Sequence, residues 1–190
     1  MIANQRDFMT DKITLVTSNV LLRPFEKEDL QYLVTWFNDA DLRNKIGEIS
    51  PMTIQDANNW FEKTSDDESR KWFAIELIKS KRIIGEAGLL RIFKEWKTTD
   101  MSIVIAEQDC QRKGYGVEIA NVLLEYAFQT LKLHRVSIGV VSFNQIAINF
   151  WKKVGFKEEG IQRDGYFCNN KYHDFVMMSF LEGEYHGNSN

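Results

Sequence analysis

Cysteine is scarce in this sequence, since only Cys110 and Cys168 occur among its 190 residues. The two thiols share no CxxC spacing, and they do not combine with histidines in a pattern that is typical of metal ligands. Such a small number fits a reducing compartment and argues against a disulfide framework. We therefore expect two ordinary thiols and no bound metal.

The chain also lacks a strong excess of one charge and a long apolar run. Its 24 Lys and Arg against 27 Asp and Glu give a net charge of -3, so the overall balance indicates neither a nucleic-acid footprint nor a membrane surface. No apolar run approaches the length of a membrane span, and residues 1–12 contain no apolar segment typical of a signal peptide. These absences predict a cytoplasmic protein without nucleic-acid or membrane partners.

What the chain does contain is enough apolar material for one core. Hydrophobic residues make up 44% and aromatic residues 13% of the sequence, and 190 residues are hardly enough for two cores. Polar, patternless stretches at both ends are typical of frayed tails. We expect a single domain over residues 13–182, with tails at 1–12 and 183–190.

Hydrophobic periodicity predicts a mixed α/β fold in the order β-α-α-β-β-β-α-β-α-β-β. Helices are expected over residues 26–39, 50–63, 116–131 and 144–156. Strands are expected over residues 19–25, 71–78, 82–93, 98–107, 134–141, 156–164 and 172–181. The second helix begins with Thr53 and Asp56 at the spacing of a capping box, and Gly155 stands where the fourth helix should end.

The most informative stretch is Gln111, Arg112, Lys113, Gly114, Tyr115 and Gly116, which lies between an expected strand and an expected helix. A helix entered through glycines offers free N–H groups and the positive end of its dipole, which together suit a phosphate. A P-loop would need Gly-Lys-Ser/Thr, which does not follow either glycine. A dinucleotide loop would need a small residue where Ile119 stands.

In this loop the sequence resembles the GNAT superfamily of acyl-CoA N-acetyltransferases, whose Gln/Arg-x-x-Gly-x-Gly/Ala motif binds the pyrophosphate of coenzyme A. Residues 127–165 resemble the second half of the family in order and spacing, and the resemblance covers residues 19–181. It implies a mixed, mostly antiparallel sheet of about seven strands with helices on both faces, splayed between strands four and five. Acetyl-CoA would be the co-substrate. The ends of the chain look most like the branch of ribosomal-protein N-terminal acetyltransferases and spermidine acetyltransferases.

The resemblance also implies which residues bind the donor. The backbone of Ile103, Val104 and Ile105, on the fourth strand, would bind pantetheine and polarise the thioester. Asn144 matches an asparagine that bonds the pantetheine arm, although it also stands where a helix N-cap is wanted. The loop itself contributes Gln111, Arg112, Lys113, Gly114, Tyr115 and Gly116.

Trp151 departs from the family pattern, because many relatives have at this place a tyrosine that protonates the leaving thiolate. An indole N–H donates a hydrogen bond but does not give up its proton near neutral pH. Trp151 is therefore expected to be a core residue or to flank coenzyme A. Water, Tyr126, Tyr172 or the ammonium product must then protonate the thiolate.

Glu86 and Asp100 are the candidates for the catalytic base. Each interrupts the apolar pattern of a strand that borders the expected cleft, and a buried carboxylate can take a proton from an amine. The alternative for each is a carboxylate on the solvent face of its strand.

These residues predict an N-acetyltransferase that moves an acetyl group from acetyl-CoA to a primary amine by direct attack in a ternary complex. The acceptor is left open between a protein N-terminus, a polyamine and another small amine, and a homodimer is allowed. The main alternative is an acyl-CoA-binding sensor or regulatory subunit with little turnover, and a nucleotide binder is a weaker one. By analogy, residues 26–70 would form the acceptor wall. The acidic stretch 62–69 would either attract a cation or form a solvated loop.

Overall fold

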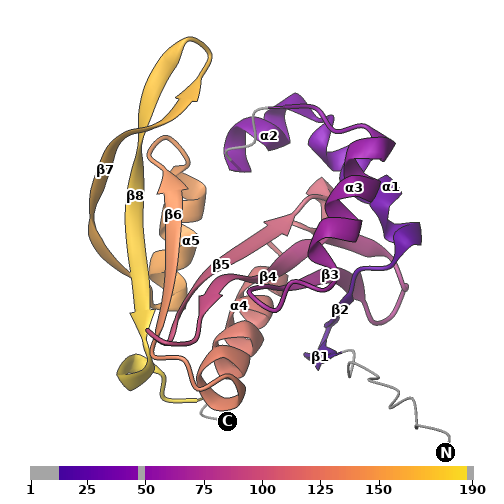
Figure 1. Cartoon of the computed structure of the whole chain (residues 1–190). Coiled ribbons are helices and arrows are strands. Elements are labelled where there is room, and N and C mark those ends of the chain that lie inside the picture. Colours follow the sequence, from indigo (N-terminus) through magenta and orange to yellow (C-terminus); the bar gives the residue numbers. More distant parts are fainter. Residues whose placement is uncertain (1–12, 47–49, 188–190) are drawn as a thin grey trace, which may run out of the picture.

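The computed structural model describes residues 13–46 and 50–187. Within them, eight strands form one sheet in the order β1-β2-β3-β4-β5-β6-β8-β7. The strands are β1 (Leu15–Val16), β2 (Val20–Pro24), β3 (Lys71–Leu77), β4 (Ile83–Phe93), β5 (Thr98–Ile105), β6 (Arg135–Val141), β7 (Lys157–Cys168) and β8 (Lys171–Leu181). Neighbouring strands pair antiparallel except β5 and β6, which are parallel (Figure 1). The mixed, mostly antiparallel sheet is confirmed, with β1 added to the seven expected strands.

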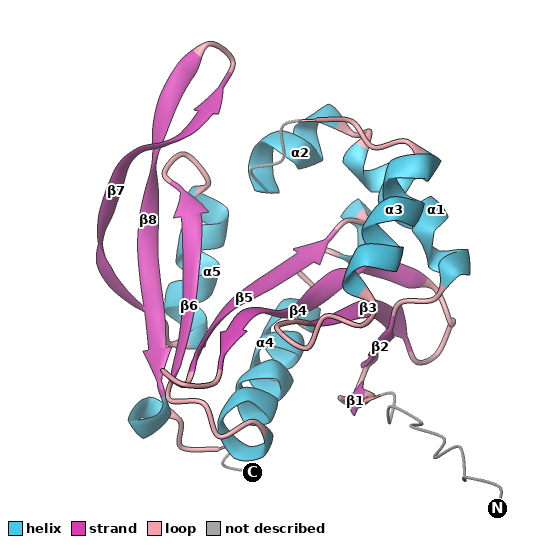
Figure 2. Ribbon diagram, viewed as in Figure 1, coloured by secondary structure: helices cyan, strands magenta, loops and turns pink. Residues whose placement is uncertain are grey.

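Helices cover both faces of the sheet, as predicted (Figure 2). They are α1 (Leu30–Phe37), α2 (Ala40–Ile46), α3 (Ile54–Thr64), α4 (Tyr115–Glu125) and α5 (Gln145–Val154). One core lies between the sheet and α4 and α5, and a second lies between the sheet and α1 and α3. Alternation along β3 feeds both cores, since Phe73 and Ile75 belong to the first and Ala74 to the second.

Local signals set several helix ends where the sequence predicted them. Thr53 accepts a hydrogen bond from the Asp56 amide at 3.1 Å, and the Asp56 carboxylate accepts from the Thr53 amide at 2.9 Å, so the capping box is confirmed. Gly155 ends α5 in the left-handed region with φ of 114°. The third expected helix is shorter than predicted, because α4 passes at Tyr126 into a π-helical turn that runs to Thr130.

The largest addition to the expected elements is α2. This two-turn helix contains no buried residue, so it lacks the apolar stripe by which a helix is recognised in a sequence. Its Asn44 accepts a hydrogen bond from Cys168 in β7 at 3.2 Å. This hydrogen bond links α2 to an element more than a hundred residues away, while the partly buried Leu42 packs against the second core.

The described structure also reaches further toward the C-terminus than expected. A 3-10 turn at Glu182–Glu184 follows β8, and the Tyr185 ring lies 5.6 Å from the Phe128 ring. Residues 183–187, which the sequence assigned to a tail, therefore belong to the described structure. The predicted tail at 1–12 and residues 188–190 lie outside the described residues. Every helix in the described ranges is too short or too polar to cross a membrane.

The sheet opens between β5 and β6. These strands pair only through Thr98, Thr99 and Asp100, which lie opposite Arg135, Val136 and Ser137. Beyond that point β5 stays paired with β4 as far as Ile105, while β6 stays paired with β8. The predicted splay between the fourth and fifth expected strands is therefore present, and the two strands diverge in Figure 1.

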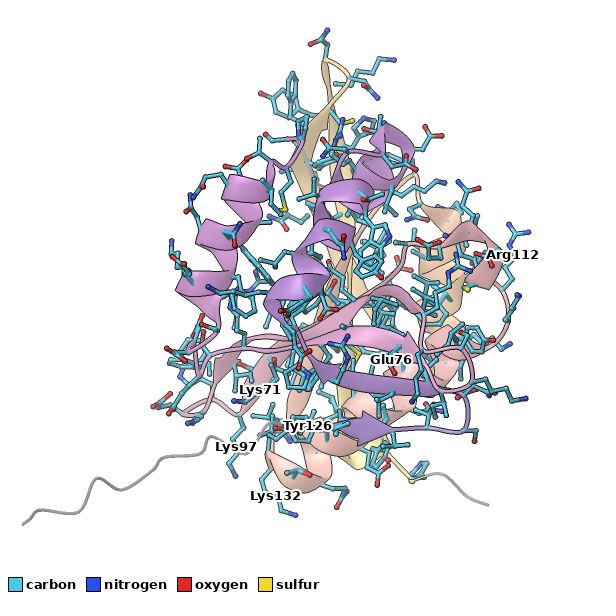
Figure 3. The ribbon with its side chains drawn as sticks, turned by 90° about the vertical axis from the view of Figure 1, so that its right-hand side faces the viewer. Lys71, Glu76, Lys97, Arg112, Tyr126 and Lys132 are labelled. Carbon is cyan, nitrogen blue, oxygen red and sulfur yellow. The ribbon has the colours of Figure 1, made fainter. Side chains whose placement is uncertain are left out.

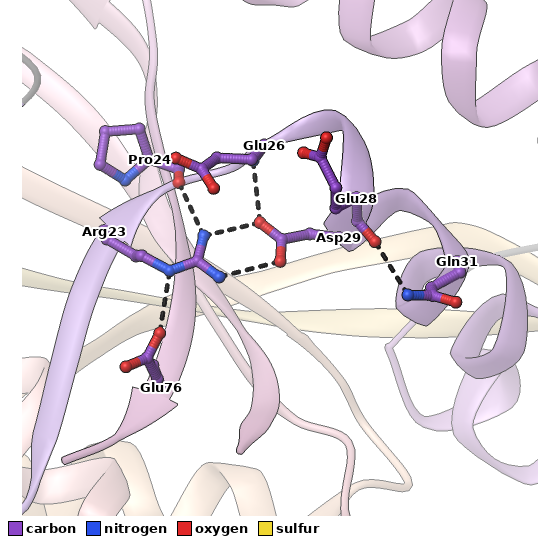
Figure 4. A network of polar contacts seen from close by, with 7 residues as sticks. All are labelled: Arg23, Pro24, Glu26, Glu28, Asp29, Gln31 and Glu76. Carbon is purple, nitrogen blue, oxygen red and sulfur yellow. Dashed lines mark hydrogen bonds and ion pairs between the residues drawn. The ribbon is translucent and has the colours of Figure 1, made fainter. Parts of the chain in front are cut away.

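Arg23 anchors α1 to the sheet through a partly buried network (Figure 4). Its guanidinium donates to both oxygens of Asp29, at 2.7 and 2.9 Å, and to Glu76 at 3.0 Å. Asp29 is 3% exposed and also accepts from the Glu26 amide at 2.8 Å. The hydrogen bond to Asp29, more than any other contact, raises the pKa of the Arg23 guanidinium. The network links the start of α1 to β2 and β3.

Replacing Arg23 by Met should therefore destabilise the protein by about 3 kcal/mol, because it leaves the buried Asp29 carboxylate without its cation. Urea unfolding measures the change. The matched control is Lys27→Met, whose ion pair with Glu62 has side chains 63% and 68% exposed and should contribute less than about 0.5 kcal/mol. Equal losses in the two variants would contradict an anchoring role for Arg23.

Candidate active site

The opening between β5 and β6 defines the candidate site. The stretch 101–105 of β5 has no strand partner on the β6 side among the described residues. Ile103 and Ile105 pack into the core beneath α4 and α5. Val104 lies opposite Glu86 on β4 and therefore shares the other face of the sheet with it. The backbone of residues 101–105 thus forms a free strand edge, with one face of the sheet on either side of it.

The predicted loop lies directly beyond the end of β5. Gln111 donates from its side-chain amide to the Ile105 carbonyl at 2.9 Å, which ties the loop to the strand. Arg112 and Lys113 are exposed, and Figure 3 shows Arg112 at the surface. Gly114 is the N-cap of α4 and has φ of 90°, a left-handed conformation that favours glycine.

The first turn of α4 offers free donors. Gly114 has no side chain, so no side-chain cap is present. The amides of Val117 and Glu118 donate to the Gly114 carbonyl. In the described part of the chain, the amides of Tyr115 and Gly116 have no protein acceptor. Two N–H groups at the positive end of a helix dipole are suited to a phosphate oxygen.

The structural reason for a glycine at position 116 differs from that at position 114. A Cβ at Gly116 would lie 3.1 Å from a carbon of the Phe150 ring, so α5 approaches this turn closely. The sequence analysis predicted that glycines at this helix start leave N–H groups free for a phosphate, and that prediction stays open. The structure shows that the Phe150 ring occupies the space beside it.

Gly116→Ala should accordingly lower stability by about 1 kcal/mol, because the added methyl presses on the Phe150 ring. The same substitution should cost less in a Phe150→Leu background, where the ring is gone. Thermal unfolding of the two single variants and the double variant measures this difference. Gly183→Ala is the control, since nothing lies within 4 Å of a Cβ at that position. An equal cost of Gly116→Ala in both backgrounds would rule out the Phe150 contact as its cause.

The side-chain amide group of Asn144 makes two hydrogen bonds, one through its oxygen and one through its nitrogen. Its carbonyl oxygen accepts from the Ala147 amide at 3.1 Å, so it is the N-cap of α5. Its amide donates to the Lys45 carbonyl, in the last turn of α2, at 3.0 Å. The N-cap reading is confirmed, and the pantetheine contact stays a prediction.

Trp151 lies in the core as expected, with 6% of its surface exposed. Its ring makes edge contacts with Phe150 at 4.8 Å and Phe156 at 4.9 Å. The two tyrosines named as proton donors are poorly suited to that role. Burial raises the pKa of Tyr126, whose hydroxyl meets no partner among the described residues. Tyr172 is 65% exposed and lies on the β7–β8 hairpin, beside Phe167.

The two carboxylates proposed as bases have different surroundings. Glu86 is 5% exposed and accepts a hydrogen bond from the Trp72 indole at 3.2 Å. A solvent-facing position is therefore excluded for Glu86. Asp100 lies at the last pair between β5 and β6, and its carboxylate forms an ion pair with the exposed Arg91. Its charge is thus already neutralised.

A cavity of about 420 Å³ adjoins the open end of the sheet on the α1 side. It is lined by Thr35, Trp36, Asp39, Leu42, Ala106, Glu107, Gln108 and Asp109. The Trp36 indole donates to Glu107 at 3.0 Å, and Arg82 binds both Glu107 and Asp109. The hydrogen bond from Arg82 is the main reason why the pKa of Asp109 is lowered. Lys113 also acts on Asp109, and Asp39 accepts from the Asp41 and Leu42 amides at the start of α2. The three carboxylates still outnumber the two cations, Arg82 and Lys113, so the cavity is on balance negative.

This cavity was not predicted from the sequence, because its walls come from separate parts of the chain. Trp36 and Asp39 lie in the range 26–70 that was expected to form the acceptor wall, but no pattern joined them to Glu107 and Asp109. The acidic stretch 62–69 is engaged elsewhere, since Asp67 binds Ser69 and Arg70 and Glu68 binds Lys94. No group of His, Cys, Asp or Glu within the described residues is arranged to hold a metal ion.

Residues 19–157 match the acetyltransferase (GNAT) domain family, and the chain belongs to that family. It is an acetyl-CoA-dependent N-acetyltransferase with acetyl-CoA as its co-substrate. The chain is 26% identical to the spermidine N(1)-acetyltransferase of Vibrio cholerae over 90% of this chain and 97% of that protein. It is also 35% identical, over 42% of this chain and 44% of the relative, to a putative ribosomal N-acetyltransferase of Bacillus subtilis.

Solved structures agree with these relationships. The crystal structure of the V. cholerae spermidine N-acetyltransferase in complex with CoA and spermine superposes with a TM-score of 0.83 at 27% identity. The match covers 89% of this chain and 99% of that chain. A dodecameric structure of the same enzyme superposes with a TM-score of 0.77 at 27% identity over 92% of this chain and 100% of that one.

Proposed function

We propose that this acetyltransferase acts on a primary amine of a polyamine such as spermidine, by direct attack on the thioester while donor and acceptor are bound together. The observation that carries the proposal is the negative cavity at the open end of the sheet, on the side of α1 and α2. A polyamine is a chain of cations that suits such a wall. The similarity to spermidine acetyltransferases over nearly the whole chain supports the same acceptor class.

The donor would lie along the unpaired edge of β5. Bound acetyl-CoA supplies an acetyl group already activated as a thioester. In this proposal the backbone of Ile103, Val104 and Ile105 holds the pantetheine arm. The free amides of Tyr115 and Gly116 hold the pyrophosphate, and Arg112 and Lys113 add positive charge beside it. Asn144 would reach pantetheine with the amide that now contacts Lys45.

Glu86 is the stronger of the two candidates for the base. It is buried on the face of the sheet that Val104 shares, and α1 and α3 cover that face. An ammonium group must lose a proton before it attacks, and burial favours the neutral, protonated form of a carboxylate. Asp100, which is paired with Arg91, would instead hold the base of the opening.

The leaving thiolate would take its proton from water or from the newly formed ammonium. The indole of Trp151 has no transferable proton, and it is packed between two phenylalanine rings. Self-association is part of the same proposal, because a dodecameric form exists for the V. cholerae relative. The homodimer allowed by the sequence resemblance is its simplest form.

A panel of amines tests the acceptor class. Release of free thiol from acetyl-CoA should be fastest with spermidine or spermine, and it should be slower with amino-sugars and with peptides that carry a free N-terminus. Asp39→Asn should raise the KM for the polyamine more than the KM for a monoamine, because a polycation gains more from the cavity's charge than a single ammonium does. Fastest release with a peptide would overturn the polyamine proposal. Tight CoA binding without release for any amine would favour the sensor alternative.

The role of Trp151 has its own test. Trp151→Phe should keep kcat within about tenfold, because no acidic proton is lost with the indole. Trp96→Phe is the matched control, since Trp96 is 75% exposed and lies at the turn between β4 and β5. A Trp151→Phe variant that folds and binds CoA normally but loses more than about a hundredfold in kcat would contradict the proposal.

A further inference from the structure

Glu118, in the first turn of α4, joins two parts of the chain that are about a hundred residues apart. Its carboxylate accepts from the Thr17 hydroxyl at 2.7 Å, from the Asn19 amide nitrogen of the main chain at 3.1 Å and from the Asn19 side chain at 2.7 Å. Both partners lie in the turn between β1 and β2. All three donors are neutral, so none of these contacts pairs the carboxylate with a cation.

Glu118 lies two residues beyond Gly116, the last residue of the predicted phosphate loop, and in the same first turn of α4. Gly114 caps α4 without a side chain, so local capping does not fix the direction of the first turn. Contacts from elsewhere must do so. Phe150 approaches Gly116 from α5, Gln111 ties the loop to β5, and the Glu118 carboxylate ties the helix to the β1–β2 turn.

If only its charge mattered, Glu118 would weaken binding of the donor. A carboxylate in the first turn is favourable for the helix dipole, but it repels a pyrophosphate bound at the same helix end. Removing the charge would then tighten donor binding. If the hydrogen bonds matter more, removing them would loosen the turn and weaken donor binding. The sign of the change therefore separates the two roles.

We propose that Glu118 is a positioning residue for the donor, and that Thr17 and Asn19 hold it in place. Three hydrogen bonds at short distances fix the carboxylate, and the carboxylate fixes the turn that carries the free amides of Tyr115 and Gly116. The inference rests on the proposed function, because it takes that turn as the pyrophosphate site. It assigns a role in donor binding to a segment that lies outside the loop and the opening.

Calorimetry with CoA tests the proposal on three variants. Asn19→Ala removes one side-chain hydrogen bond, keeps the Thr17 hydroxyl and the main-chain N–H in place, and should raise the Kd about threefold. Glu118→Gln loses the charge-assisted bonds and should raise it about tenfold. The double variant should bind CoA no more weakly than Glu118→Gln, since both substitutions break the same contact, the one between Asn19 and Glu118. At saturating donor, kcat should stay within about twofold of the wild type for a residue that only positions.

The matched control is Glu125→Gln, an exposed carboxylate at the last residue of the same helix, which should leave the Kd unchanged. Thermal unfolding confirms that each variant is folded at the temperature of the titration. Tighter binding by Glu118→Gln, or an unchanged Kd in Asn19→Ala, would overturn the positioning role while the proposed function stands. Failure of the wild type to bind CoA would instead overturn the proposed function itself.

Discussion

The limited pairing of β5 with β6 is the constraint on which the site depends. Only three residues of each strand pair, and beyond Asp100 and Ser137 each strand stays with its other neighbour. The backbone of β5 therefore has hydrogen-bonding groups that no strand satisfies, and an extended ligand can pair with them as an added strand would. Everything else in the site is arranged around this edge.

Side chains at the closed end hold the opening in place. Arg135, in the short paired segment of β6, binds Glu159 on β7, and Ser179 on β8 donates to the same carboxylate at 2.8 Å. The hydrogen bond from Arg135, ahead of that from Ser179, lowers the pKa of Glu159 to about 2. The carboxylate is therefore ionised at any ordinary pH, and β6, β7 and β8 are joined where β5 begins to diverge.

The two sides of the β5 edge have opposite electrostatic character. On one side, the start of α4 presents free N–H groups at its positive end, with Arg112 and Lys113 beside it. On the other side, the cavity near α1 gathers three carboxylates. An anionic donor and a cationic acceptor would thus approach the same backbone edge from regions of complementary charge. The net charge of the chain is only -3, so this contrast comes from the distribution of its charges and not from an excess of one sign.

Sequence patterns predicted the parts of this arrangement that depend on local physics. β-branched runs predicted seven of the strands, the Thr53 capping box was found, and Gly155 was placed at the end of α5. The resemblance to the family predicted the splay. The parts that were missed depend on contacts between distant residues. Nothing in the sequence around α2 indicates a helix without a buried face, and nothing near Glu118 indicates its partners at Thr17 and Asn19. The close approach of Phe150 to Gly116 likewise cannot be read from the sequence, and the ligand contact of the Gly116 amide stays a prediction.

Amide hydrogen exchange with and without CoA tests the central claim that the β5 edge and the start of α4 form the donor site. The account predicts slower exchange on CoA addition in segments 101–105 and 113–117, because their unpaired amides gain acceptors or lose access to water. Segment 175–180 of β8, already paired with β6, should not change. Protection of another region, with segments 101–105 and 113–117 unaffected at saturating CoA, would contradict the account.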